Sequence, residues 1–131
     1  MAKENECCTT DARTVLACSG ASNVGQITNE VAKRLDTEGV ARFFCVAGVG
    51  AKISGMVESV RAASKVLVLD GCSVACAKKC MDQAGLMGYE YLVVTDLGIN
   101  KTHAFELAAG DVDQAYEAAR RKIPVAAATP I

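Results

Sequence analysis

Short apolar runs alternate with segments of helical periodicity along most of the chain. The four runs, rich in β-branched and aliphatic residues, cover residues 13–18, 41–46, 65–69 and 91–94. Each is followed by a segment in which apolar residues recur every three or four positions, which is typical of a helix that packs by one face. Such strand–helix units in succession favour a parallel sheet joined by right-handed crossovers. We therefore expect an α/β fold: a single-domain open parallel sheet of four to five strands with helices on both faces, in a three-layer Rossmann-like or flavodoxin-like arrangement.

Capping signals mark the ends of the predicted helices. These helices are expected to begin at Asn23, near Ile53, near Ser73 and at Asp111. Gln26 follows Asn23 by three residues, and Gln114 follows Asp111 by three, so each pair is expected to form a capping box. Residues 125–131 are expected to add, at most, a weak edge strand.

Composition restricts the chain to one globular domain. A chain of 131 residues, 51% of them apolar, can build one hydrophobic core but not two. Its net charge of −1 gives no basic excess for binding nucleic acid or an anionic membrane surface. No apolar run approaches the roughly 20 residues of a membrane span, and the first residues do not resemble a signal peptide. We expect one cytoplasmic domain over residues 1–131, with a mobile N-terminus over residues 1–12 and no nucleic-acid or membrane partner.

Three of the seven cysteines recur at the same place in consecutive strand–helix units. Cys18 ends the first strand, Cys45 lies at the end of the second, and Cys72 directly follows the third, so that they are spaced by 27 residues. The carboxyl ends of parallel strands meet at one edge of the sheet, where open α/β folds place their sites. Cys76 follows Cys72 by four residues, or one helical turn, and is expected on the same side. The sequence thus predicts four sulfur atoms at one edge of the sheet.

Four cysteine thiolates are the ligand set of a closed tetrahedral zinc site. We therefore expect a metal-binding protein in which the ligands of Zn²⁺ are Cys18, Cys45, Cys72 and Cys76. Its role would be structural, storage or transfer, because no coordination position is left open for a reacting water. The helix expected after Cys72 would direct its positive N-terminus at the sulfur atoms and favour thiolates.

Two alternatives use the same four cysteines. An iron–sulfur cluster needs the same set of thiolates. A thiol-based redox or sulfur-transfer enzyme would use Cys72 as nucleophile, and its second thiol would be one of Cys18, Cys45 and Cys76. The sequence leaves both alternatives open.

The other cysteines and the single histidine carry weaker predictions. Cys80 lies two turns along the predicted helix and is expected to be a buried packing residue. Cys7 and Cys8 precede the first strand and are either extra ligands or exposed thiols. His103 is expected at the surface, and Asp70 is expected to form a turn or to accept hydrogen bonds beside the site.

Several motifs together resemble those of a known family. They are Cys18-Ser-Gly, Ser22-Asn-Val-Gly-Gln, Cys45-Val-Ala-Gly, Asp70-Gly-Cys-Ser-Val-Ala-Cys-Ala-Lys-Lys and Thr95-Asp-Leu-Gly. From residue 13 to residue 103 the chain resembles the DGC-domain family, small prokaryotic proteins that are described as zinc-binding and named for the Asp-Gly-Cys tripeptide. The resemblance implies that the family's four chelating cysteines correspond to Cys18, Cys45, Cys72 and Cys76. It implies no reaction, and nothing carries over to Cys7, Cys8 or Cys80.

Overall fold

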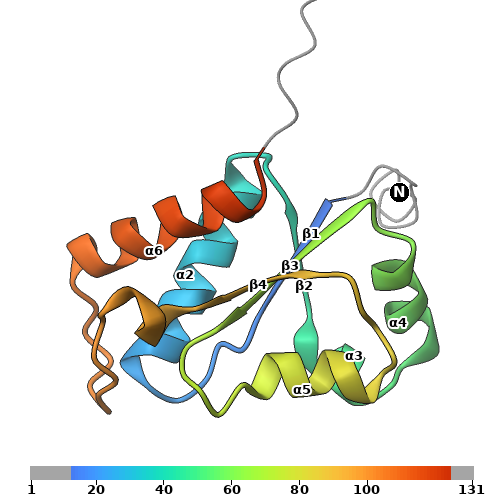
Figure 1. The fold of residues 1–131 in the computed structure, drawn as a ribbon, viewed down its shortest axis with the longest axis horizontal. Helices are drawn as coiled ribbons and strands as arrows, with labels where there is room; N and C mark the ends of the chain where they lie inside the picture. The colour runs from blue at the N-terminus through green and yellow to red at the C-terminus, as the bar shows by residue number, and fades with distance from the viewer. Residues whose placement is uncertain (1–12, 125–131) are drawn as a thin grey trace, which may run out of the picture.

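One parallel sheet of four strands forms the centre of the molecule (Figure 1). A computed structural model describes residues 13–124 of the chain. The strands are β1 (Arg13–Ala17), β2 (Arg42–Phe44), β3 (Lys65–Asp70) and β4 (Glu90–Val93), and their order in the sheet is β2-β1-β3-β4. The predicted α/β class and open parallel sheet are confirmed. The N-terminus over 1–12 and the edge strand expected over 125–131 lie outside the described residues.

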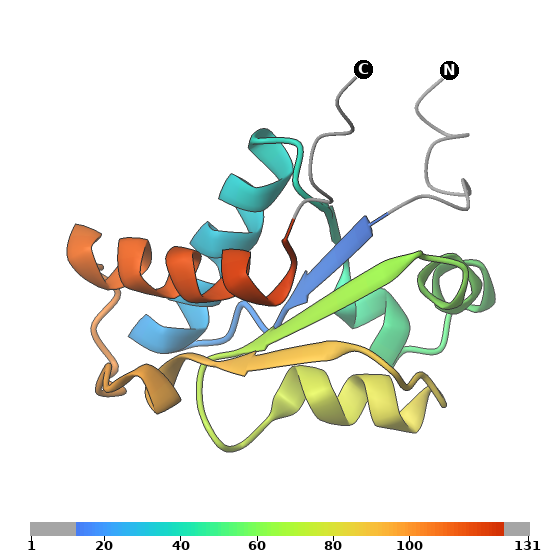
Figure 2. The same cartoon turned by 45° about the horizontal axis from the view of Figure 1, so that its top comes forward.

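Helices cover both faces of this sheet, as predicted (Figure 1, Figure 2). The helices on one face are α2 (Asn23–Thr37) and α6 (Ala109–Lys122). Those on the other face are α3 (Val46–Gly50), α4 (Ser54–Arg61) and α5 (Cys76–Gln83). A short 3-10 helix, η1 (Val94–Leu97), follows β4. The result is the three-layer arrangement expected from the alternating pattern.

The central strands β1 and β3 are buried on both faces. Successive side chains of a strand point to opposite sides of the sheet. Val15 and Leu67 accordingly pack with residues of α2 and α6, whereas Leu16 and Val68 pack with residues of α4 and α5. Burial on both faces explains why the β3 sequence is a continuous apolar run instead of an alternating one.

The order of the strands opens a crevice between β1 and β3. The connection after β1 runs through α2 on one face, whereas the connection after β3 runs through α5 on the other. Ligand sites of open α/β sheets lie at such a switch point, outside the carboxyl ends of the strands. Cys18, whose backbone N–H donates to the carbonyl of Leu69 (3.0 Å), and Cys72 follow these two strands. The fold therefore places two of the predicted site residues next to each other.

Helix α2 begins where the sequence predicts, but a different residue caps it. Ser22, not Asn23, is the N-cap, and its hydroxyl accepts the backbone N–H of Gly25 (3.0 Å). Gln26 does not return to the cap residue, because its amide donates to the carbonyl oxygens of residues 19 and 20 (3.3 and 2.9 Å). The predicted capping box is therefore wrong, and the side chain of Asn23 is engaged elsewhere.

The last two helices also start differently from the prediction. Helix α5 begins at Cys76 instead of near Ser73, because residues 72–75 form a separate turn. Helix α6 begins at Ala109, before the predicted cap at Asp111, and Gln114 donates to the carbonyl of Leu97 (2.9 Å). The capping box predicted for α6 therefore does not form.

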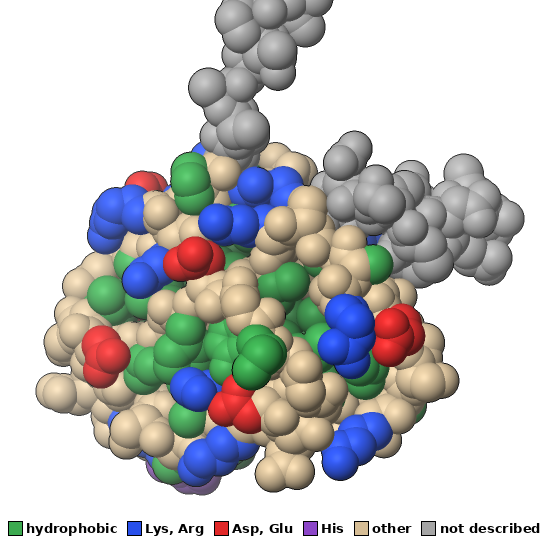
Figure 3. Space-filling view, turned by 45° about the vertical axis from the view of Figure 1, so that its right-hand side comes forward, with side chains coloured by type: hydrophobic (Ala, Val, Ile, Leu, Met, Phe, Trp, Pro, Cys, Tyr) green, Lys and Arg blue, Asp and Glu red, His purple; other side chains and the backbone are tan. Residues whose placement is uncertain are grey.

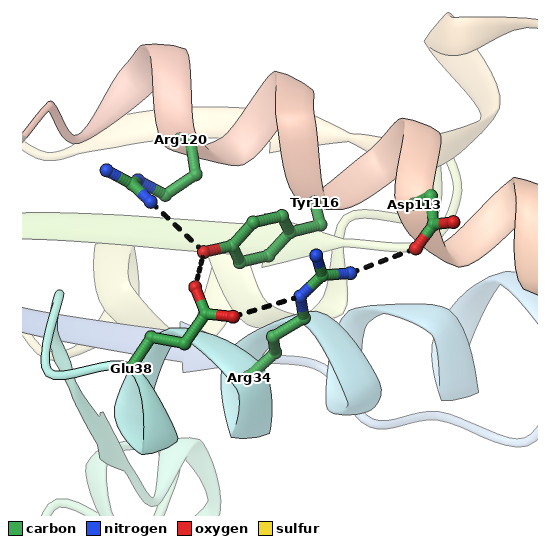
Figure 4. Close-up of polar contacts among 5 residues, drawn as sticks. All are labelled: Arg34, Glu38, Asp113, Tyr116 and Arg120. Carbon is green, nitrogen blue, oxygen red and sulfur yellow. Dashed lines mark hydrogen bonds and ion pairs between the residues drawn. The ribbon is translucent and has the colours of Figure 1, made fainter.

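A polar network joins α2 to α6 (Figure 4). The Tyr116 hydroxyl donates to the carboxylate of Glu38 and accepts from Arg120 (3.1 Å). Arg34 lies over the Tyr116 ring, 3.8 Å from its centre, and bridges Glu38 (3.4 Å) and Asp113 (2.9 Å). The hydrogen bond from Tyr116, together with the hydrogen bond and charge of Arg34, holds the pKa of Glu38 below its usual range. The network fixes α6 on the sheet next to α2.

The surface carries both signs of charge. On the face shown in Figure 3, Lys and Arg side chains are interspersed with Asp and Glu, in keeping with the net charge of −1. Large apolar side chains are also exposed, most of all Met87 in the turn before β4, with 89% of its surface accessible. Within residues 13–124, no helix has the length and apolar character needed to cross a membrane.

Candidate functional site

A cleft at the carboxyl edge of the sheet brings together three of the four predicted ligands. It has a volume of about 260 Å³ and lies between the residues that follow β1 and those that follow β3. Cys18, Cys72 and Cys76 all line it, together with Lys101 from the loop after η1. We call it the thiol cleft. Its position confirms that the cysteines after β1 and β3 meet at one edge of the sheet.

Cys45, the fourth predicted ligand, lines a second cleft. This cleft has a volume of about 340 Å³ and is walled by Phe43 and Phe44, with Cys18 also on its wall. Strand β2 ends at Phe44, earlier than the predicted end at residue 46, and the chain turns at once into α3 with Cys45 as the residue before its first turn. Cys45 is exposed. The early turn places Cys45 in a different cleft from Cys72 and Cys76. Cys18 is the residue that lines both clefts.

The side chains do not form the predicted four-thiolate site as they are arranged. Within residues 13–124, no group of three or more His, Cys, Asp or Glu side chains is placed to hold a metal ion. A closed zinc–thiolate site needs four sulfur atoms about 2.3 Å from one point. The predicted ligands are instead divided between two clefts. Cys7 and Cys8, expected to be either extra ligands or exposed thiols, lie outside the described residues.

The Cys18 sulfur is engaged in a hydrogen bond with Thr28. It lies 3.6 Å from the hydroxyl oxygen of Thr28. That hydroxyl donates its own proton to the carbonyl of Gly25 (2.6 Å) and accepts the backbone N–H of Ser19 (3.1 Å). A hydroxyl group has one proton to donate and two lone pairs, so the Cys18 thiol is the donor in the remaining contact. Cys18 is therefore a hydrogen-bonded thiol on the wall of the cleft.

Cys72 has a cation beside its sulfur. The ammonium group of Lys101 lies 3.4 Å from Cys72 Sγ. Cys72 is half-buried and packs against the core cluster beneath α2 and α6. A neighbouring ammonium group stabilises a thiolate more than a neutral thiol, and thiolates are the reactive form of cysteine. Among the cleft cysteines, Cys72 therefore has the surroundings of a nucleophile.

Asp70 occupies the helix terminus that was expected to face the sulfur atoms. It is buried, with 1% of its surface exposed, and its two carboxylate oxygens accept the backbone N–H groups of Ala77 (2.8 Å) and Lys78 (2.9 Å). The hydroxyl of Tyr91 donates to the same carboxylate (2.8 Å). Burial and this hydrogen bond raise the pKa of Tyr91, which keeps the hydroxyl protonated. Asp70 thus accepts two of the free N–H groups at the start of α5, the helix terminus that was expected to face the sulfur atoms.

The remaining cysteine of α5 is a packing residue. Cys80 is half-buried, and its sulfur lies so close to Gly50 of α3 that a Cβ atom at that position would approach it to 2.8 Å. Burial, together with the neighbouring Cys76 and Asp70, raises the pKa of the Cys80 thiol. His103 lies at the surface, as predicted, with its ring centre 5.2 Å from that of Phe105.

Two turns beside the clefts hold strained residues. Ser19 and Ala75 have positive φ values, 51° and 60°, which side chains with a Cβ atom rarely adopt. Ser19 is held by its hydroxyl, which donates to Asn29 (2.8 Å), and Ala75 by its N–H, which donates to the carbonyl of Cys72 (3.1 Å). Backbone strain of this kind clusters at functional sites.

Sequence reasoning did not identify Lys101 or Thr28 as part of the site. Thr28 is in the second turn of α2, where it reads as a residue of the helix face. Lys101 is in the loop that follows β4 and η1. The available signal was topological: in a parallel sheet this loop leaves the same edge as Cys18 and Cys72, so its charged residues were candidates for the site.

Comparison with known proteins supports the family resemblance. The sequence profile of the DGC domain matches residues 14–119, which includes every residue of the thiol cleft. The chain is 34% identical over 102 residues to the anaerobic and virulence modulator AnvM of Pseudomonas aeruginosa, covering 78% of each protein. No solved structure matches. With residues 14–119 matched by the profile and 34% identity to this relative over 102 aligned residues, the chain belongs to the DGC-domain family.

Proposed function

We propose that this protein is a redox-responsive thiol protein in which Cys72 reacts as a thiolate. The observation that carries the proposal is the contact of 3.4 Å between Lys101 Nζ and Cys72 Sγ. Cysteine reactivity depends on the thiolate form, which nearby cations favour. Cys72 also lines an open cleft of about 260 Å³, so a small oxidant has access to it.

A second thiol in the cleft completes a disulfide cycle. With a hydroperoxide as oxidant, the Cys72 thiolate attacks the outer oxygen, the O–O bond breaks, and the leaving alkoxide or hydroxide takes up a proton. Cys72 becomes a sulfenic acid. A thiol then attacks its sulfur, forming an S–S bond and releasing hydroxide, which leaves as water with the proton of that thiol. Two electrons pass from the two cysteines to the peroxide.

Cys76 is the better placed second thiol. It is exposed on the same cleft as Cys72, whereas the Cys18 thiol is committed to a hydrogen bond with Thr28. Cys76 is also the first residue of α5, next to the turn 72–75, so a change of that turn would move the two sulfur atoms relative to each other. The relative AnvM is named an anaerobic and virulence modulator. Oxidisable thiols in an open cleft suit a modulator of that kind.

Removal of the Lys101 charge is expected to slow the reactions of Cys72. In Lys101→Met, alkylation of Cys72 by iodoacetamide at pH 7 should be about two- to fivefold slower, since an exposed charge pair makes a modest contribution. The rate is measured by mass spectrometry of the peptide that contains Cys72. Lys33→Met, which removes the same charge from an exposed pair with Glu30 on α2, is the matched control and should react like the wild type.

Treatment with a hydroperoxide, followed by the same mass spectrometry, distinguishes the roles of Cys72 and Cys76. Cys72→Ser should abolish disulfide formation, whereas Cys76→Ser should leave Cys72 as a sulfenic acid that is trapped by dimedone. An unchanged alkylation rate in Lys101→Met, or disulfide formation that persists in Cys72→Ser, would contradict the proposal.

Zinc binding by Cys18, Cys45, Cys72 and Cys76 is a second candidate. It is favoured by one observation: Cys18 lines both the thiol cleft and the cleft of Cys45, so the two groups of predicted ligands have one cysteine in common. Four thiolates would hold the metal without an open position. Binding would require the Cys18 thiol to leave Thr28 and the sulfur atoms to turn toward one point.

Elemental analysis of anaerobically purified protein tests this candidate. One zinc per chain, lost in Cys45→Ser and kept in Cys80→Ala, would support it, because a serine hydroxyl is a poor zinc ligand at neutral pH. Iron instead of zinc would indicate the cluster alternative. Protein that contains neither metal would exclude both zinc and an iron–sulfur cluster as resident groups, and it would agree with the redox proposal.

A further inference from the structure

We infer that Asn23 is a positioning residue that holds Lys101 against the sulfur of Cys72. The inference rests on the proposed function and concerns the same site. Asn23 belongs to α2 on one side of the cleft, whereas Lys101 belongs to the loop after η1. Nothing in the sequence connects the two residues, which are 78 positions apart in the chain.

Asn23 binds the loop on both sides of Lys101. Its side-chain oxygen accepts the backbone N–H of Thr102 (2.6 Å), and its side-chain amide donates to the carbonyl of Asn100 (2.8 Å). Its own backbone N–H donates to the carbonyl of Thr102 (3.0 Å). Three hydrogen bonds from one residue therefore fix the main chain immediately before and after Lys101.

The loop needs such an anchor. Residues 100–106 are all exposed, and Ile99 is the buried residue that precedes them. Short exposed loops of this kind sample many conformations unless hydrogen bonds hold them. The contact between Lys101 and Cys72 is a single hydrogen bond to a flexible side chain, which is not sufficient to order the main chain by itself. Asn23, at the start of helix α2, holds the main chain of this loop in one conformation.

Asparagine suits this role because its amide both donates and accepts. The side chain meets one N–H and one carbonyl of the loop at the same time. As the first residue of α2, Asn23 also has a backbone N–H that the helix itself does not use. The cap of α2 is supplied by Ser22, so replacement of Asn23 leaves the start of the helix intact.

The test is the rate of Cys72 alkylation by iodoacetamide in a double-mutant cycle. Asn23→Ala should slow the reaction by a factor comparable to that of Lys101→Met, about two- to fivefold. In the Lys101→Met background, Asn23→Ala should have no further effect, because the charge it positions is already absent. A general loosening of the fold would change the rate in both backgrounds, so this readout separates positioning from stability.

Asn100→Ala is the matched control. Asn23 contacts Asn100 through the main-chain carbonyl, which this substitution keeps, so the rate should equal that of the wild type. If Asn23→Ala fails to fold, as judged by circular dichroism, Asn23→Ser takes its place in the cycle, because serine is common at helix starts but too short to reach both groups of the loop.

The outcomes separate the inference from the proposed function. If Lys101→Met slows the reaction and Asn23→Ala does not, the inference is overturned and the proposed function stands. If Asn23→Ala slows the reaction equally with and without Lys101, Asn23 has a structural role only, and the inference is again overturned. If Lys101→Met has no effect, the proposed function fails before the inference is reached.

Discussion

Asp70→Ala is expected to lower the free energy of unfolding by about 3 kcal/mol. The carboxylate is 1% exposed and accepts three hydrogen bonds, two from the N-terminus of α5 and one from the hydroxyl of Tyr91. Alanine would leave these three donors without their acceptor in a part of the molecule with little access to water. Hydrogen bonds to charged groups contribute about 1.5–3 kcal/mol each, and the cost of burying the carboxylate offsets part of that sum.

Chemical denaturation of the variant measures this change. Tyr91→Phe removes one of the three hydrogen bonds and keeps the charge, so it should lower the free energy of unfolding by about 1 kcal/mol. Hydrogen exchange adds a local test, since the amides of Ala77 and Lys78 should exchange faster in Asp70→Ala than in Tyr91→Phe. A stability of Asp70→Ala within about 0.5 kcal/mol of the wild type would contradict this account.

The fold could be predicted from the sequence because its signals are local. Each strand is a short apolar run, and the run of β3 lacks polar alternation because Leu67 and Val68 face two separate cores. The positions of Cys18 and Cys72 followed from the rule that parallel strands share a carboxyl edge. Neither prediction needed the position of any side chain.

The separation of Cys45 could not be predicted in the same way. Gly48 and Gly50 suggest a turn after β2, but both lie in α3. A Cβ atom at Gly48 would approach the Met56 sulfur to 2.2 Å, and one at Gly50 would approach the Cys80 sulfur to 2.8 Å. These glycines allow α3 to approach the side chains of Met56 and Cys80 closely. The contact with Cys80 joins residues thirty positions apart, so the sequence pattern around Cys45 does not reveal it.

The contacts around Cys72 also could not be predicted from the sequence pattern. The capping of α5 by Asp70 depends on the left-handed residue Ala75, which shifts the start of the helix to Cys76. The approach of Lys101 depends on Asn23, through hydrogen bonds to the main chain of a loop that has no periodic pattern. Local propensities contain no information on such contacts.

Each residue of the Asp70-Gly71-Cys72 tripeptide has a distinct role in this geometry. Asp70 caps α5 and thereby sets the turn that ends at Cys76. Cys72 presents its sulfur to Lys101. Gly71 lies between them, and its carbonyl accepts the backbone N–H of Thr95 from η1 (3.1 Å). The tripeptide therefore connects α5, η1 and the loop that carries Lys101.

Gly71→Ala is expected to destabilise the protein by about 3 kcal/mol and to disturb the thiol cleft. A Cβ atom at this position would lie 2.7 Å from the backbone nitrogen of Gly25 and from the carbonyl carbon of Val24. Both are main-chain atoms in the first turn of α2, so no side chain can rotate away. Overpacking against such atoms costs about 1–3 kcal/mol or more and is relieved only when the segments move apart. Because Lys101 is held to α2 by Asn23, this movement takes Cys72 away from Lys101.

Gly25→Ala should act in the same way, since its Cβ atom would lie 2.6 Å from the carbonyl oxygen of Gly20. The matched controls are Gly55→Ala in α4 and Gly110→Ala in α6, where a Cβ atom meets nothing within 4 Å. These two should be as stable as the wild type or up to about 1 kcal/mol more stable, because alanine favours a helix over glycine. Thermal unfolding compares the stabilities of the four variants, and the rate of Cys72 alkylation by iodoacetamide shows whether the thiol cleft is disturbed. Wild-type stability of Gly71→Ala would show that the turn after β3 does not approach α2 this closely, and the contact between Cys72 and Lys101 would then need another explanation.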